Sequence, residues 1–192
     1  MRAGGSRVED ERVRVFVALE LPDVALRSLI EWRDRALRTT PGARPLPAEA
    51  IHVTLCFLGW RSAREIPAIR DACGVLGAQG SPELALGEPV WLPPRRPRVL
   101  AVELDDHAGR LVQAQGALSE VLAAGGWYEP ERRPYLPHVT TARLKAAPAS
   151  RGRLPDSPRL SFRASRAVLY RSRLYRGGAR YEALDTFRLS TA

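Results

Sequence analysis

The chain has 192 residues, of which 45% are hydrophobic, so it can bury the core of a domain and wholesale disorder is excluded. No apolar run is long enough to span a membrane, and the acidic N-terminal segment lacks the apolar stretch of a signal peptide. Two cysteines and three histidines do not supply the four closely spaced ligands of a structural zinc site. We therefore expect a cytoplasmic protein with reduced thiols, no membrane partner, and no metal or other cofactor.

The net charge of +9 comes from 30 basic residues against 21 acidic ones, and every basic residue except Lys145 is an arginine. The planar guanidinium group matches the oxygens of a phosphate, and a basic surface attracts polyanions such as nucleic acids. An arginine-rich and alanine-rich composition is also what a GC-rich genome produces. The charge is therefore compatible with a nucleic-acid partner and does not by itself establish one.

The first part of the chain predicts a strand, a helix, a loop and a second strand. Residues 13–21 are apolar and rich in β-branched side chains, and Asp23 is expected to cap the helix that follows them. Residues 39–48 contain three prolines and a glycine, which indicate a loop. The apolar run 51–58 then predicts the second strand. Residues 1–12 are expected to be a flexible tail outside this domain.

The middle of the chain predicts one helix and one strand. Ser62 and Glu65 have the spacing of a capping box, which indicates that a helix begins there and ends before Gly80. Residues 84–91 predict a strand, and the basic, proline-rich segment 93–97 predicts a stiff loop.

The remainder repeats the order of the first part. Residues 98–104 predict a strand, and Asp105 or Asp106 is expected to cap a helix that stops at Gly125 and Gly126. Residues 135–144 complete the repeat. The other expected elements are a long mobile loop at residues 145–158 and two closing strands at residues 168–174 and 181–189.

Two identical triplets stand at the same place in the two repeats, His52-Val53-Thr54 and His138-Val139-Thr140. The histidines are 86 residues apart, and the opening strands of the two repeats are 84 residues apart. With three histidines and seven threonines in the chain, two such matches arise by chance in about 0.4% of cases. A single histidine beside a threonine on a strand is usually structural, but the doubled arrangement favours a functional site. His107 has no threonine two residues later and is expected to be a surface residue.

Residues two apart on a strand point to the same face, so His52 and Thr54 are expected to project together while Val53, Leu55 and Phe57 enter the core. His138 and Thr140 are expected to project in the same way. Two imidazoles can give and take protons near neutral pH, and threonine hydroxyls can donate to phosphate oxygens. The pattern therefore predicts an acid–base site, without a metal, that opens a cyclic phosphodiester.

These motifs and their flanks resemble the 2H phosphoesterase superfamily, and within it the RNA 2′,3′-cyclic phosphodiesterase family, formerly called 2′-5′ RNA ligases. The resemblance covers nearly the whole chain after Val13. The segments that carry it are RVFVALELP, AEAIHVTLCFLG, PRVLAVEL, RRPYLPHVTTARL and LYRSRLYRGGARYEAL, the last with Ser172 and Tyr181 at the family's spacing. It implies one bilobal α+β domain over residues 13–192. Two antiparallel sheets with pseudo-two-fold symmetry would flank a central cleft, with the helices outside.

The resemblance also implies roles for single residues. His52 resembles the proton donor to the leaving 3′-oxygen, and His138 resembles the proton acceptor that activates water, so that the product carries a 2′-phosphate. Thr54 and Thr140 resemble the hydroxyls that orient the phosphate. Arg143 stands where the family often has an arginine that contacts the phosphate. Strict alternation, however, places Arg143 on the strand face opposite His138, so it reaches the cleft only if the strand bends or ends there.

The expected substrate is an RNA end with a 2′,3′-cyclic phosphate, acted on by a monomer. Three alternatives remain open from the sequence. The chain could be an RNA-binding protein with weak catalysis, the site could run in reverse and form a 2′-5′ linkage, or the substrate could be a small cyclic nucleotide.

Overall fold

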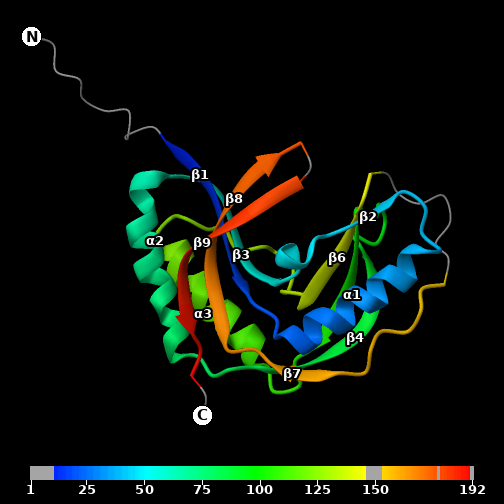
Figure 1. Cartoon of the computed structure of the whole chain (residues 1–192). Helices are drawn as coiled ribbons and strands as arrows, with labels where there is room; N and C mark the ends of the chain where they lie inside the picture. The colour runs from blue at the N-terminus through cyan, green and yellow to red at the C-terminus, as the bar shows by residue number, and fades with distance from the viewer. Residues whose placement is uncertain (1–10, 146–152, 177, 191–192) are drawn as a thin grey trace, which may run out of the picture.

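The computed structural model describes residues 11–145, 153–176 and 178–190. Nine strands within these residues form two antiparallel sheets, which stand on either side of the molecule with helices outside them (Figure 1). The expected bilobal α+β architecture is therefore confirmed. The first strand begins at Arg12 and takes in the end of the segment expected to be a tail, whereas residues 1–10 lie outside the described residues.

The first sheet has the strand order β3-β1-β8-β9. Its members correspond to four predicted strands, and their bounds are β1 (Arg12–Leu19), β3 (Val53–Ser62), β8 (Arg166–Tyr175) and β9 (Gly178–Arg188). Strand β1 lies in the middle and buries Val13, Val15 and Val17, because alternate residues of a strand face the same side. Its burial explains why the sequence signal of this strand is strong.

The second sheet has the order β2-β6-β5-β4-β7. Its strands are β2 (Ala43–Pro45), β4 (Glu83–Leu92), β5 (Val99–Asp105), β6 (His138–Leu144) and β7 (Ser161–Arg163). The three long strands, β4, β5 and β6, were predicted from the sequence. The two edge strands were not predicted. Each has three residues, which is too short to show a periodic pattern, and β2 lies inside the segment expected to be a loop. The loop expected at residues 145–158 falls partly outside the described residues, and its residues 153–158 form no helix or strand.

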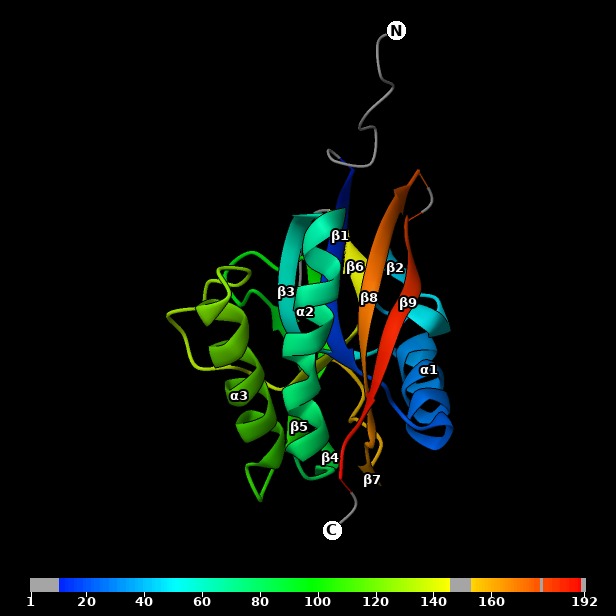
Figure 2. The ribbon, with the colours of Figure 1, turned by 90° about the vertical axis from the view of Figure 1, so that its left-hand side faces the viewer.

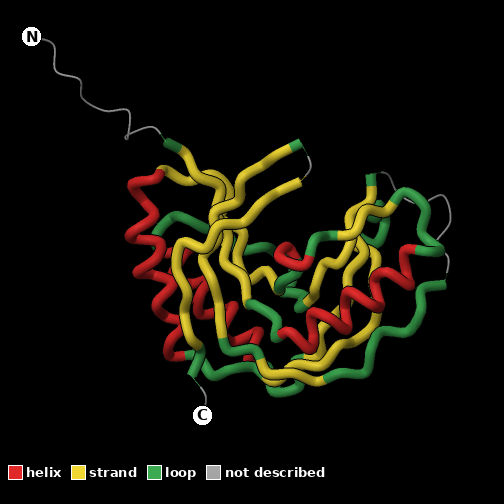
Figure 3. Tube along the Cα trace, viewed as in Figure 1, coloured by secondary structure: helices red, strands yellow, loops and turns green. Residues whose placement is uncertain are grey.

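Three α-helices cover the outer faces, α1 (Asp23–Leu37), α2 (Ile66–Cys73) and α3 (Arg110–Ala124). Helix α1 follows β1 in the chain but packs against β2 and β6 of the second sheet. Helix α3 follows β5 of the second sheet but packs on β3 of the first, beside α2 (Figure 2). Each sheet is thus covered by the helix that the other repeat supplies, and Figure 3 shows both helix groups outside the strands. None of these helices is both long and apolar enough to cross a bilayer.

The helix ends correct one prediction and support two others. Asp23 does not cap α1. Pro22 is the N-cap residue, and Asp23 lies in the first turn, where a carboxylate still favours the helix dipole. The capping box of Ser62 and Glu65 is present, and it opens a short 3-10 turn at Ala63–Glu65 that leads into α2.

At α3 the N-cap residue is Gly109, with a φ of 67° that favours glycine. Asp106 still caps this end in part, because its Oδ2 accepts the backbone N–H of Val112 at 2.9 Å. The helix stops at Gly125 and Gly126, as the sequence predicted.

Candidate active site

The two histidine motifs lie at corresponding places in the two sheets. His52 comes directly before β3, and Thr54 is the second residue of that strand. His138 opens β6, and Thr140 is its third residue. Strands β3 and β6 lie close to each other across the molecule, and His138 is near enough to His52 to influence its charge. The structure therefore brings together the two segments that the sequence singled out.

Both motif strands contain a β-bulge directly after the threonine. On β3, Thr54 pairs with Ala18 and Cys56 pairs with Val17, so that Leu55 has no partner. An extra residue of this kind shifts the side-chain alternation by one position. Phe57 consequently points away from the core and is 46% exposed. The prediction that Phe57 is a core residue is therefore wrong, whereas Leu55 is buried as expected.

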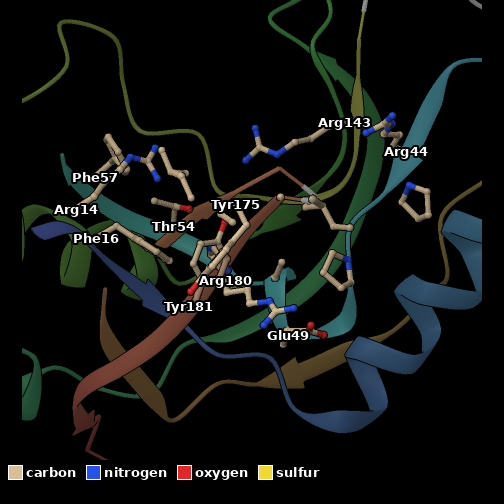
Figure 4. Close-up of a pocket in the computed structure, with 18 of the residues that line it drawn as sticks. Arg14, Phe16, Arg44, Glu49, Thr54, Phe57, Arg143, Tyr175, Arg180 and Tyr181 are labelled. Atoms are coloured by element: carbon tan, nitrogen blue, oxygen red, sulfur yellow. The ribbon is translucent and has the colours of Figure 1, made fainter. Parts of the chain in front are cut away.

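The same irregularity occurs on β6. Thr140 pairs with Ala101 and Ala142 pairs with Leu100, so that Thr141 is the extra residue. The shift turns Arg143 to the side of His138 and Thr140. The arginine that strict alternation placed on the wrong face thus lines the cleft (Figure 4).

A cavity of about 750 Å³ lies between the lobes and is lined by residues of both. His52 lines it from the first lobe. Thr54 and Phe57 also contribute from the first lobe, and Arg143 contributes from the second (Figure 4). His138 and Thr140 are half-buried and are not among the residues that line it. The cavity is strongly basic, because five arginines and a single glutamate stand among its described lining residues.

His52 is enclosed by aromatic rings. The Phe16 ring stacks on the imidazole with centroids 5.0 Å apart, and the Tyr181 ring meets it edge-on at 5.4 Å. Burial, together with the charges of Arg143 and His138, lowers the pKa of His52 to about 4. With this pKa the imidazole is neutral at pH 7.

His138 has a different environment, in which one ring nitrogen is anchored. Its Nδ1 lies 2.8 Å from the carbonyl oxygen of Leu136. A carbonyl only accepts hydrogen bonds, so Nδ1 carries the proton and Nε2 presents a lone pair when the ring is neutral. A proton acceptor needs this tautomer.

One residue that the sequence analysis did not single out connects the two motifs. The hydroxyl of Tyr135 donates to the carbonyl oxygen of Thr54 at 2.9 Å, although Tyr135 lies three residues before His138. Burial raises the pKa of this phenol, so it remains a donor at all ordinary pH values. The short distance in sequence to His138 was the only available signal.

Of Ser172 and Tyr181, which the family resemblance indicated, Tyr181 lies beside His52 and Ser172 lies behind it as its cross-strand partner. They are partners across β8 and β9, and Tyr181 contacts the imidazole directly. Ser172 is buried and accepts a hydrogen bond of 2.8 Å from Nη1 of Arg14. Arg14 lines the cavity, and the sequence analysis did not single it out.

A further arginine, Arg44 of β2, is the direct cross-strand partner of Arg143. Like charges in this position repel each other, and neither side chain has an ion pair or hydrogen bond with another described residue. An anion bound between the two guanidinium groups would relieve the repulsion.

Within the described ranges, no group of three or more His, Cys, Asp or Glu residues is placed to hold a metal ion.

The family model of the 2′-5′ RNA ligase superfamily matches residues 22–176. The chain belongs to this superfamily. It is 29% identical over 180 residues to the RNA 2′,3′-cyclic phosphodiesterase of Escherichia coli (strain K12), and the match spans 94% of this chain and 98% of the relative. Identity to the protein of the same name from Thermus thermophilus is 30%, over 92% of this chain and 90% of that one.

Solved structures agree with these sequence matches. Escherichia coli LigT in complex with 3′-AMP superimposes with a TM-score of 0.80 and 28% identity, over 94% of this chain and all of the other. TT0787 of Thermus thermophilus gives a TM-score of 0.79 and 25% identity, over 93% and 98% of the two chains. The family and the fold that the motifs predicted are thus confirmed.

Proposed function

We propose that this protein hydrolyses the 2′,3′-cyclic phosphate at the end of an RNA and leaves a 2′-phosphate. The observation that carries the proposal is that the two His-Val-Thr segments lie on strands that contact each other, with His52 lining a basic cavity and His138 near enough to affect the pKa of His52. The relatives from Escherichia coli and Thermus thermophilus, which align over nine-tenths of this chain, bear the name of this activity. The structure of Escherichia coli LigT in complex with 3′-AMP supports a nucleotide phosphate as a ligand of this chain.

In the proposed reaction, Nε2 of His138 takes a proton from a water molecule, whose oxygen attacks the phosphorus atom. The bond between phosphorus and the 3′-oxygen breaks, and His52 gives its proton to that oxygen. One proton is taken up and one is released, so a 2′-phosphomonoester and a free 3′-hydroxyl result. The anchored Nδ1–H of His138 suits the acceptor role, because it leaves Nε2 unprotonated.

The donor role requires a proton on His52, whose pKa is about 4 in the protein alone. A phosphate anion bound beside the imidazole adds an opposite charge, which raises this pKa and allows the ring to hold a proton. The aromatic wall of Phe16 and Tyr181 keeps water away and so strengthens the attraction between the ring and the phosphate. Binding of the substrate would therefore favour the protonated form of His52, which is the form that a proton donor needs.

The remaining site residues would hold the phosphate. The hydroxyls of Thr54 and Thr140 donate hydrogen bonds to its non-bridging oxygens, and Arg143 with Arg44 supplies positive charge. These donors would then stabilise the negative charge that develops on the phosphate oxygens during the attack.

The test uses a short RNA that ends in a 2′,3′-cyclic phosphate, incubated with the full chain in the presence of a chelator. We expect a 2′-phosphate product, identified by chromatography against 2′- and 3′-phosphate standards. His52→Ala and His138→Ala should each lower kcat about 10²- to 10⁴-fold, because each removes one proton-transfer group.

His107→Ala is the matched control, since His107 is exposed and lies outside the cleft. It should retain the wild-type rate. Unchanged RNA ends with the wild-type chain, or a 3′-phosphate product, would contradict the proposed function.

A further inference from the structure

A second aromatic feature of the cavity takes no part in the chemistry proposed above. Tyr175 is the last residue of β8, and its side chain is 54% exposed. The guanidinium of Arg180, on β9, lies over this ring with Cζ 5.2 Å from the centroid. Both residues line the cavity (Figure 4). A large exposed ring that faces a cleft and carries a cation on one face is typical of a stacking site.

This pair is displaced from the reaction centre along the sheet. Ser172 is the cross-strand partner of Tyr181, the residue that contacts His52. Tyr175 lies three residues further along β8, which corresponds to about 10 Å. Tyr175 is therefore placed to contact a part of the substrate that lies beyond the reacting phosphate.

A comparable pair lies next to the reaction centre. Cζ of Arg14 lies 4.5 Å from the centroid of the Phe57 ring. The cross-strand partner of Phe57 is Phe16, which stacks on His52. The same cavity thus holds one arginine-aromatic pair beside the histidine and another further away. Two separate stacking sites in one basic cleft match two successive bases of a nucleic acid strand better than they match a single nucleotide.

The size and charge of the cavity agree with this interpretation. Its volume of about 750 Å³ lies in the upper part of the range of roughly 300–1,000 Å³ for small-molecule pockets. Among its described lining residues, five arginines stand against one acidic residue, Glu49. A cyclic mononucleotide carries one phosphate, so most of this charge would be left unmatched, whereas an RNA strand brings a further phosphate with each nucleotide.

We propose that Tyr175 and Arg180 form a subsite for a base of single-stranded RNA. This base belongs to the nucleotide on the 5′ side of the terminal nucleotide, which carries the cyclic phosphate. The base stacks on the face of the Tyr175 ring that Arg180 leaves free. Stacking on a π-face tolerates any base, so the subsite selects for the presence of a base and not for its identity. This inference rests on the proposed function and adds a length requirement to it.

The experiment compares three substrates, namely a 2′,3′-cyclic mononucleotide, a dinucleotide with the same end, and that dinucleotide with an abasic first residue. The measured quantity is the ratio of kcat/KM for the dinucleotide to kcat/KM for the mononucleotide. Tyr175→Ala should lower this ratio about 5- to 150-fold, which corresponds to the loss of one stacked base. Tyr175→Phe retains the ring and should keep the wild-type ratio.

The abasic substrate separates stacking from other effects of the substitution. With the wild-type chain it should lose the same factor as Tyr175→Ala loses with the intact dinucleotide, and the two losses should not add. Trp60→Ala is the matched control, because Trp60 is an exposed aromatic residue of the same sheet that does not line the cavity. Additive losses, an unchanged ratio for Tyr175→Ala, or an equal fall for Trp60→Ala would overturn the subsite.

The failure of the proposed function would have a different appearance. In that case the wild-type chain turns over neither the mononucleotide nor the dinucleotide. The subsite is then judged by the equilibrium binding of the same dinucleotides with 2′-phosphate ends, measured by fluorescence anisotropy of labelled RNA. The subsite is supported if Tyr175→Ala binds the intact dinucleotide more weakly than the wild type does but binds the abasic dinucleotide equally well. Equal binding of the intact dinucleotide by the wild type and Tyr175→Ala overturns it.

Discussion

The two lobes have the same triplet followed by the same bulge, but they surround the triplet differently. In the first lobe His52 is stacked against Phe16 and Tyr181, and its pKa is lowered to about 4. In the second lobe the ring of His138 is tied by Nδ1 to a backbone carbonyl. The repeated motif therefore fixes where the imidazoles lie, and the surroundings decide which proton each ring holds.

The position five residues after each histidine shows the same contrast. The bulges at Leu55 and Thr141 turn this side chain into the cleft in both lobes. The first lobe has Phe57 there, and the second has Arg143. A matched backbone thus presents an apolar ring on one side of the cleft and a cation on the other, which suits a ligand with a base at one end and a phosphate at the other.

The largest effect is expected from substituting the residues five positions after the two histidines. Arg143→Ala should lower kcat about 10²- to 10³-fold, since it removes a donor and a charge from the phosphate oxygens in the transition state. Phe57→Ala, at the equivalent position, should mainly raise KM and lower kcat much less. Steady-state kinetics on the cyclic-phosphate RNA measure both variants, and equal losses of kcat would refute the division between the lobes.

A smaller effect is expected in the pH dependence of stability. Between pH 6.5 and about 4 the unfolded chain binds a proton at His52 that the folded chain does not, so stability falls as the pH falls through this window. The contribution of His52 amounts to about 3 kcal/mol at most. Denaturant unfolding at pH 7 and pH 4 measures it as the difference between the wild type and His52→Asn. His138→Asn serves as the comparison from the other lobe, and the same difference for both variants would show that burial of His52 is not the cause.

The smallest effect is expected from loosening the contact between the motifs. Tyr135→Phe removes the hydrogen bond to the carbonyl of Thr54 and should destabilise the fold by about 1 kcal/mol. It should also lower kcat several-fold, because Thr54 is then held less firmly. Tyr170→Phe is the matched control, since it loses a hydroxyl that bonds to Glu20 instead. Unfolding curves and kcat give both readouts, and an unchanged kcat for Tyr135→Phe would exclude a positioning role.

The long strands and helices were predicted from the sequence because their apolar periodicity is strong. The sequence predicts the starts of the motif strands to within about three residues, and the doubled triplet by itself indicates a shared site. The bulges could not be predicted in the same way. Whether Leu55 or Thr141 lacks a partner depends on how a neighbouring strand pairs, which is a non-local property. For this reason Phe57 was assigned to the core and the orientation of Arg143 stayed open.

Other parts of the site depend on contacts between distant segments. Tyr135 acts on Thr54 from 81 residues away, and Arg14 reaches Ser172 across 158 residues. Arg44 stands beside Arg143 only because the three-residue strand β2 pairs with β6. No local sequence pattern reveals contacts between segments that are so far apart in the chain, so only the structure places these residues in the site.

The exchange of helices between the lobes bears on how such a chain could have arisen. Helix α1 follows β1 but covers the second sheet, and α3 follows β5 but covers the first. One repeat on its own would leave its long helix, α1 or α3, without the sheet that this helix covers in the whole chain. A single repeat would therefore bury the apolar face of that helix only by pairing with a second copy of itself. With both repeats in one chain, the two halves of the cleft can carry different residues, as Phe57 and Arg143 show.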